Sequence, residues 1–327
     1  MDQEGKVLAK SRVSTDRPAI QNYLKSLDGL KPTKAVIEAG FNWSYFYDQL
    51  AEEIEEVCLA HPLKTRLIAE ARIKTDSLDS ETLAHLLRSD LIARAYAPSW
   101  ETREVKNLLR FRISLVRIRT SLKNKVHSVL DRHQVEDNVF RGLTDKFGKT
   151  GMKIMRSLEL RGNDRAILNG YLDLIEELSR RIAALNKQIK ALVKEDEISS
   201  YLKTVPGFGD LLGLLLRYEI DNMERFASAK KLCSYVGIVP STYSSGGKTW
   251  HGRITKEGNK WRRWVVIEAV HGAIITSPSL RRYYNSVKQR RGDKAATIAL
   301  ARKLLEIIYH VWKEKRPYYE KELAYTV

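Results

Sequence analysis

The alternation of apolar and polar positions changes along the chain, from short elements in the first hundred residues to long helices afterwards. Short apolar runs in the first part predict three strands, over residues 7–13, 35–38 and 57–60. Apolar positions three and four apart predict helices over residues 15–27, over residues 43–53 and from Pro62 onward. Strands that alternate with helices indicate an α/β layer, in which functional side chains gather at the strand ends.

Beyond residue 100 the apolar positions recur every seven residues, which is the spacing of helices that pack along their length. A first series predicts one long helix, with Leu108, Leu115, Leu122 and Val129 on one line and Phe111 and Ile118 on its companion. A second series follows a break near residues 141–150, with Tyr171, Leu178, Leu185 and Leu192 beside Ile175, Ile182 and Ile189. These helices predict an antiparallel coiled-coil arm that offers a surface to another protomer, although an ordinary helical bundle would give the same pattern.

The two patterns together predict three domains in the 327-residue chain: an α/β domain over 1–98, a coiled-coil arm over 99–197 and a mostly helical domain over 198–327. Lys and Arg number 57 against 40 Asp and Glu, and the resulting charge of +17 favours a polyanionic partner such as nucleic acid. The sequence contains no apolar run long enough to span a bilayer, and its N-terminus does not have the pattern of a signal peptide. Cys58 and Cys233 lie in apolar contexts typical of buried thiols, so we expect a cytoplasmic protein.

Three carboxylates in the N-terminal part are candidates for a metal site. Glu38 ends a predicted strand, and Asp76 and Asp79 stand three residues apart at a predicted helix start, on one face of that helix. Such carboxylates bind hard cations like Mg²⁺, which serve phosphodiester chemistry. The plainer interpretation is that Thr75 or Asp76 caps the helix while Asp79 interacts with its dipole, and spacing alone favours it.

A turn between two helical patterns is a candidate for phosphate binding. Its sequence is Pro206-Gly207-Phe208-Gly209, which predicts a helix-hairpin-helix turn. Gly207 and Gly209 would let backbone N–H groups approach a phosphate, and the start of the next helix would favour the anion. Any tight turn between helices also favours glycine, so this motif alone does not decide between the two roles.

Serine and glycine gather further along the chain, in Ser244-Ser245-Gly246-Gly247. Taken alone, this run is more typical of a flexible loop than of a catalytic one. The neighbouring Trp250, Trp261 and Trp264 are likewise more typical of a core or an interface than of base stacking. Basic side chains flank the run as a phosphate-binding surface requires, namely Lys248, Arg253, Lys256, Lys260, Arg262 and Arg263.

The motifs, taken in order, resemble the IS110 (insertion-sequence 110) family, the DEDD transposases related to Piv-type DNA invertases. The order is Glu38, Lys74-Thr75-Asp76-x-x-Asp79, Pro206-Gly207-x-Gly209, Pro240 to Ser245-Gly246, and Arg253-Ile254-Thr255-Lys256-x-Gly258-Asn259. Each motif is weak alone, but their common order covers essentially the whole chain. The resemblance implies a RuvC-like (RNase H-like) N-terminal domain, a coiled-coil insertion and a C-terminal transposase domain.

The resemblance also implies roles for individual residues. Glu38, Asp76 and Asp79 match the second, third and fourth acids of the DEDD tetrad, which holds Mg²⁺. Ser245 matches the family's nucleophile, which forms a covalent serine–DNA intermediate. Family members choose their sites through a structured RNA from the element's own ends. The implied partners are therefore DNA, a guide RNA and a second copy of the chain bound through the coiled coil.

The first acid of the tetrad has no match in this sequence. It normally stands on the opening strand, whereas Asp2 falls on a turn, so we do not assign it that role. We expect either a start upstream of Met1 or a shortened copy, with an open sheet edge and weakened metal binding. Three interpretations follow: a transposase or recombinase, a RuvC-like structure-specific endonuclease that needs no serine, and a non-catalytic remnant that binds nucleic acid.

Overall fold

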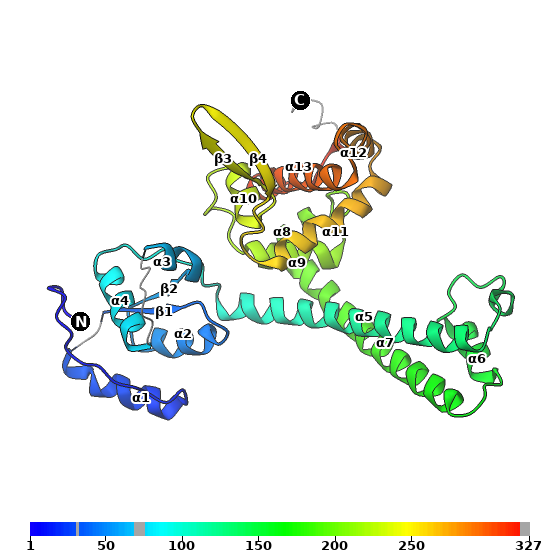
Figure 1. The fold of residues 1–327 in the computed structure, drawn as a ribbon, viewed down its shortest axis with the longest axis horizontal. Coiled ribbons are helices and arrows are strands. Elements are labelled where there is room, and N and C mark those ends of the chain that lie inside the picture. Colours follow the sequence, from blue (N-terminus) through cyan, green and yellow to red (C-terminus); the bar gives the residue numbers. More distant parts are fainter. Residues whose placement is uncertain (31–32, 69–75, 321–327) are drawn as a thin grey trace. The chain divides into compact units, whose positions relative to one another are not determined.

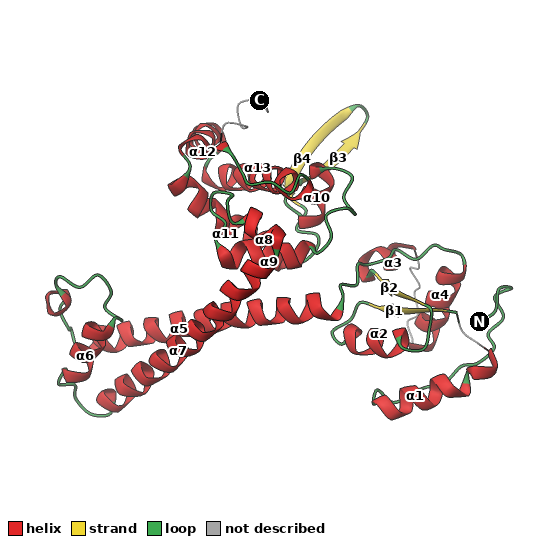
Figure 2. Ribbon diagram, turned by 180° about the vertical axis from the view of Figure 1, so that it is seen from behind, coloured by secondary structure: helices red, strands yellow, loops and turns green. Residues whose placement is uncertain are grey.

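The computed structural model describes residues 1–30, 33–68 and 76–320, and the chain divides into two compact units, Met1–Pro98 and Ser99–Val327 (Figure 1). The first unit combines helices with a small parallel sheet. The described residues of the second form helices and one β-hairpin (Figure 2). The architecture is therefore α/β in the first unit and mainly α in the second, in agreement with the sequence pattern.

A parallel pair of strands, β1 (Lys34–Glu38) and β2 (Glu56–Ala60), forms the centre of the first unit. Helix α2 (Trp43–Ala51) connects them, because parallel strands need a crossover. On the other side of β2, an antiparallel bridge joins Ala60 to Arg94. These elements confirm the predicted strand–helix–strand order.

Side chains alternate across a strand, so each face of this sheet has its own core. On one face Val57 packs in a cluster with α1 (Arg17–Ser26) and α2. On the opposite face Val36 packs with Leu86 of α4 (Asp76–Arg88). The unit also contains α3 (Pro62–Ile68) and the short 3-10 turn η1 (Asp28–Leu30).

The strand predicted over residues 7–13 is wrong, because this segment pairs with no strand in the described part of the chain. The N-terminal segment instead lies along α4. Lys10 Nζ is 3.0 Å from Glu81 Oε2, and Arg88 donates a hydrogen bond of 3.2 Å to the Gln3 carbonyl. Val7 and Leu8 of this segment remain exposed, so the segment lacks the buried face that fixes a strand in a sheet.

Two long helices, α5 (Trp100–Arg132) and α7 (Asp164–Glu195), pack side by side in the second unit. Their connector contains η2 (Asp137–Phe140) and α6 (Lys149–Ser157). Side-chain hydrogen bonds link the long helices in antiparallel register, from Arg112 to Asn186 at 3.0 Å and from Arg119 to Ser179 at 3.2 Å. The two helices and their antiparallel direction are as predicted.

The predicted apolar lines hold for α7 and only partly for α5. The isoleucine line of α7 is buried, at Ile175, Ile182 and Ile189. On α5, by contrast, Phe111 and Ile118 are each 50% exposed. The buried companions on α5 are Leu109, Ile113, Val126 and Leu130. Leu109 and Ile113 pack in the core of the C-terminal helices, whereas Val126 and Leu130 pack against the connector. Therefore α7 alone does not decide which side of α5 is buried.

The remaining helices surround one large core, to which the base of α5 also contributes. They are α8 (Glu197–Leu202), α9 (Asp210–Ile220), α10 (Ala229–Val236), α11 (Lys260–Thr276), α12 (Pro278–Arg291) and α13 (Asp293–Lys313). The hairpin of β3 (Pro240–Ser245) and β4 (Lys248–Ile254) extends from these helices (Figure 1).

Cys58 and Cys233 are buried free thiols, as predicted. Among the described residues, no helix has both the length and the hydropathy of a membrane span.

Candidate active site and nucleic-acid interface

Glu38 occupies the carboxyl end of the parallel sheet. It is the last residue of β1, its register partner is Ala60 at the end of β2, and its side chain is exposed. The chain turns immediately afterwards, where the Ala39 N–H donates to the Ala60 carbonyl at 3.1 Å. Ligands of α/β sheets usually bind at this edge, so the position suits the predicted metal ligand.

Asp76 is the first residue of α4, and Asp79 follows within the first helical turn. Asp79 is half-buried, and Leu83 and Leu86 further along α4 pack in the cluster on the sheet. Positions 79, 83 and 86 lie on one side of a helix, so Asp79 belongs to the sheet-facing side of α4.

The prediction that the three acids converge is not tested by the described side chains. Lys74, Thr75 and the side chain of Asp76 lie outside the described residues. Among the side chains that are described, no group of three potential metal ligands occurs. The acidic cluster therefore stays a prediction.

Asp2 lies on a turn, as the sequence indicates. Its carboxylate accepts backbone hydrogen bonds from Glu4 at 3.0 Å and Lys6 at 2.8 Å. The Lys6 N–H contributes most to a lowered pKa of this carboxyl group. Asp2 thus acts as a local turn residue, which agrees with leaving it out of the tetrad.

The turn between α8 and α9 forms where Pro206-Gly207-Phe208-Gly209 predicts it, and its two glycines differ in role. Gly207 has a φ of +87°, and a Cβ there would lie 2.0 Å from the Ala269 carbonyl oxygen of α11. Gly207 therefore allows close packing of two backbones. Gly209 is exposed and precedes the first turn of α9, whose backbone N–H groups have no partner within the helix.

The Ser/Gly run forms the end of a β-hairpin, so its interpretation as a loop outside secondary structure is wrong. Ser245 is the last residue of β3 and pairs with Lys248. Gly246 and Gly247 make a two-residue turn with φ values of +56° and +76°, which glycine adopts without strain. The side chain of Ser245 is exposed at the end of this hairpin. His251 pairs with Thr242, three residue pairs from Ser245, and its side chain lies outside the description.

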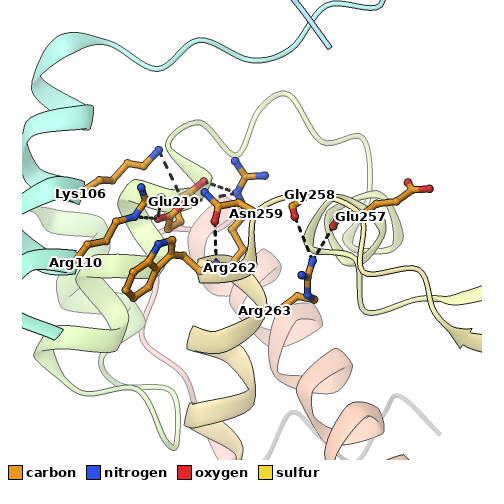
Figure 3. Close-up of polar contacts among 9 residues, drawn as sticks. Lys106, Arg110, Glu219, Glu257, Gly258, Asn259, Arg262 and Arg263 are labelled. Atoms are coloured by element: carbon orange, nitrogen blue, oxygen red, sulfur yellow. Dashed lines mark hydrogen bonds and ion pairs between the residues drawn. The ribbon is translucent and has the colours of Figure 1, made fainter. Parts of the chain in front are cut away.

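Arg262 takes part in a buried cluster of charges around Glu219 (Figure 3). Arg110 Nε donates to Glu219 Oε1 at 2.9 Å, and the Nζ of Lys106 lies 3.9 Å from Oε2. Arg262 Nε lies 3.8 Å from Oε2 and donates to the Glu219 carbonyl at 3.1 Å. The guanidinium also lies 3.9 Å from the centre of the Tyr235 ring. Arg262 therefore joins α11 to α9 and α10 in this structure.

Arg263 braces the segment that leads into α11. Its guanidinium donates to the carbonyls of Glu257 and Gly258 at 3.0 and 3.3 Å (Figure 3). It also donates to the Lys256 carbonyl at 2.8 Å. Asn259 caps α11 by accepting a hydrogen bond of 2.9 Å from the Trp261 N–H. The exposed basic side chains of this region are Lys248, Arg253, Lys256 and Lys260.

The cluster around Glu219 is not predicted by the sequence pattern. Glu219 stands near the end of the apolar helix α9, and its side chain is fully buried. A carboxylate in such a helix needs buried cations as partners, so the pattern of α9 contained a usable signal. Trp261 and Trp264 pack against the main core, as predicted, and Arg117 lies above both rings.

Comparison with known proteins gives the class of this chain. Residues 1–134 match a transposase model of the DEDD type of IS110, and residues 199–285 match the "Transposase IS116/IS110/IS902 family". The chain is 23% identical to the transposase for insertion sequence element IS1111A of Coxiella burnetii, over 97% of this chain and 86% of the relative. It is 22% identical to the transposase for insertion sequence element IS1328 of Yersinia enterocolitica, over 73% of this chain and 71% of the relative.

These matches cover both units and agree with the order of motifs in the sequence. They define the chain as a transposase, an enzyme of DNA recombination. The chain belongs to the IS110 family of insertion-sequence transposases.

Proposed function

We propose that the protein cleaves and exchanges DNA strands of its insertion sequence, with Ser245 as nucleophile and an acidic Mg²⁺ site formed by Glu38, Asp76 and Asp79. The observation that carries the proposal is the position of Ser245. It is exposed at the end of a β-hairpin, opposite Lys248, within the segment that matches the family. A phosphate can reach such a hydroxyl without any rearrangement of the core.

Ser245 would act by nucleophilic substitution at phosphorus. Its Oγ forms a bond to the scissile phosphorus while the bond from phosphorus to the leaving deoxyribose oxygen breaks. The hydroxyl proton is lost, and the leaving oxygen gains one. The Lys248 side chain, about 5 Å away as a cross-strand neighbour, would bind the phosphate and offset its charge. The serine–phosphate bond preserves the energy needed to join a new strand.

The acids would hold the metal at the carboxyl edge of a RuvC-like sheet. Carboxylate oxygens are the ligands that Mg²⁺ prefers, and exposed Glu38 with half-buried Asp79 fit that requirement. A metal bound there would polarise phosphoryl oxygens. The chain's own contribution is to fix Glu38 through the β1–β2 ladder and Asp79 through the packing of α4 on the sheet.

The nucleic-acid surface would consist of exposed groups of the second unit. Lys248, Arg253, Lys256 and Lys260 supply positive charge, and the turn of Pro206, Gly207 and Gly209 presents the N–H groups at the start of α9. Arg262 and Arg263 would stabilise the segments that carry this surface, through hydrogen bonds to the carbonyls of Glu219 and Lys256. The net charge of +17 also suits a structured guide RNA bound together with DNA.

The arm would join two copies of the chain. Phe111 and Ile118 are half-exposed on α5, seven residues apart and on the same side of the helix. Such an apolar line gains stability from a second arm. The double substitution Phe111→Ser with Ile118→Ser should lower the mass measured by light scattering, and an unchanged mass would contradict self-assembly through this line.

The proposed metal site is tested by strand cleavage in Mg²⁺. Asp79→Asn or Glu38→Gln should reduce cleavage at least about 100-fold while leaving DNA affinity within about twofold, since the acids serve chemistry. Asp48→Asn, on α2, is the matched control. If cleavage persists in both site variants, the acidic site is wrong. The same assay on the chain extended by any residues encoded in frame before Met1 tests whether an upstream acid is needed.

A further inference from the structure

The β3–β4 hairpin presents two aromatic side chains on the face that carries Ser245. The ladder pairs Ser245 with Lys248 and, two residues further from the turn, Tyr243 with Trp250. Side chains two residues apart on a strand point to the same face, and direct cross-strand partners share that face. Serine, lysine, tyrosine and tryptophan therefore form one continuous surface.

The opposite face of the hairpin has a different character. There Ser244 Oγ and Thr249 Oγ1 form a hydrogen bond of 2.8 Å. This bond shows that Ser244 and Thr249 share a face, so Ser245 and Lys248 next to them face the other way. The aromatic surface and the candidate nucleophile thus lie together, away from the small hydroxyl side chains.

Both rings are open to solvent. Tyr243 is 65% exposed and Trp250 is 55% exposed, and neither belongs to a hydrophobic core of the described residues. Gly252, the next position on this face of β4, has no side chain that would cover the Tyr243 ring. Large aromatic side chains left exposed as a group, next to a basic residue, indicate a binding surface.

We infer that Tyr243 and Trp250 stack on unpaired DNA bases next to the phosphate that Ser245 attacks, an inference that rests on the function proposed above. Ring faces of bases are accessible to side chains only where the strand is unpaired. Aromatic side chains beside positive charge are how proteins bind such strands. Lys248 on the same face would contact the backbone phosphate, so bases and phosphate would be held together.

This surface would favour DNA whose pairing is disrupted at the cleavage point over intact duplex. Tyr243 lies two residues from Ser245, about 7 Å along an extended strand, so the bound base would be a near neighbour of the attacked phosphate. The stacked base would hold the scissile phosphate at the serine during the reaction.

The test compares full-length variants by fluorescence anisotropy, on a labelled single-stranded oligodeoxynucleotide and on the duplex of the same sequence. Trp250→Leu should bind the single strand about 5- to 100-fold more weakly, with duplex affinity changed less than about twofold. The salt dependence should not change, because no phosphate contact is lost. Trp250→Phe, which keeps a ring, should retain most of the affinity. Trp100→Leu removes another exposed tryptophan and is the control.

An aromatic cross-strand pair also stabilises the hairpin itself, and the two substrates separate this role from stacking. If Trp250→Leu weakens both DNA forms equally, the ring only braces the hairpin and the inference is wrong. Single-strand affinity equal to that of the wild type would overturn it as well.

A parallel assay of covalent protein–DNA adduct separates this inference from the proposed function. If the adduct depends on Ser245 while Trp250→Leu leaves single-strand affinity unchanged, only the stacking inference fails. If the adduct survives Ser245→Ala while Trp250→Leu still loses single-strand affinity, the aromatic surface stands and the assignment of the nucleophile fails.

Discussion

Arg262 and Lys260 show at the scale of single residues that neighbouring cations of one motif have different roles. Arg262 is held between Glu219 and the Tyr235 ring, whereas Lys260, two positions earlier at the start of α11, is exposed. The sequence presents them as equivalent basic residues. Only the fold reveals which one faces a buried carboxylate, because burial depends on helices that are distant in sequence.

These two roles predict different effects for two alanine substitutions. Lys260→Ala should weaken DNA binding to a similar extent for all sequences and reduce the salt slope by about 1, since one phosphate contact is lost. Arg262→Ala should instead lower the melting temperature, because it removes a partner of buried Glu219. Anisotropy titrations at several salt concentrations and thermal unfolding measure the two effects. A changed sequence preference with an unchanged salt slope for Lys260→Ala would contradict the phosphate role.

Lys106 makes the stability of the second unit depend on pH. Burial is the main cause of a pKa lowered from 10.5 to about 8, and the nearby Glu219 only partly offsets it. Between these values the unfolded chain binds a proton that the folded chain has released, so stability rises with pH across that window. The shift corresponds to roughly 3 kcal/mol at most. Thermal unfolding from about pH 7.5 to 10 should show the wild type gaining stability relative to Lys106→Met. A constant difference would contradict this.

At the scale of elements, the turn between α8 and α9 depends on one glycine. Gly207→Ala would place a Cβ against the Ala269 carbonyl and strain a φ of +87°, so unfolding should become easier by about 2–5 kcal/mol. Gly209→Ser is the matched control, because a Cβ there meets no atom within 4 Å and serine suits the position before a helix. Chemical denaturation measures both. Equal effects of the two substitutions would show that the close approach to α11 is unimportant.

The elements that could be predicted from sequence are those determined by local pattern. Strands β1 and β2 form where short apolar runs predict them, and α7 buries its isoleucine line. The strand predicted over residues 7–13 is wrong because a strand also needs a hydrogen-bonded neighbour. The predicted companion line of Phe111 and Ile118 on α5 is not buried, because helices other than α7 cover part of α5. Both errors arise from partners that a local pattern does not contain.

The order of motifs singles out Glu38 and Ser245 as candidate site residues, and the structure places them at a strand end and a hairpin end. Their roles stay predictions. The hairpin itself was missed, although Gly246-Gly247 between two polar runs is typical of a two-residue turn. Its alternate polar and aromatic side chains lack the apolar face by which strands are usually recognised.

At the level of the whole molecule, the two compact units would have separate tasks. The first contains the acids proposed to hold the metal, and the second contains the serine, the basic surface and the arm. The family matches extend over both units. In the proposed reaction Ser245 would become covalently attached to DNA.

The most direct measurement is the covalent adduct itself, formed by the full chain with Mg²⁺, DNA of the element's ends and RNA transcribed from those ends. Denaturing electrophoresis followed by mass spectrometry identifies the attached residue. Ser245→Ala should abolish the adduct while leaving DNA affinity within about twofold, because the hydroxyl serves the reaction and not binding. Ser244→Ala should retain it, since that hydroxyl lies on the opposite face, bonded to Thr249. An adduct that survives Ser245→Ala, or DNA cleavage without any adduct, would contradict the serine mechanism and favour a metal-dependent endonuclease.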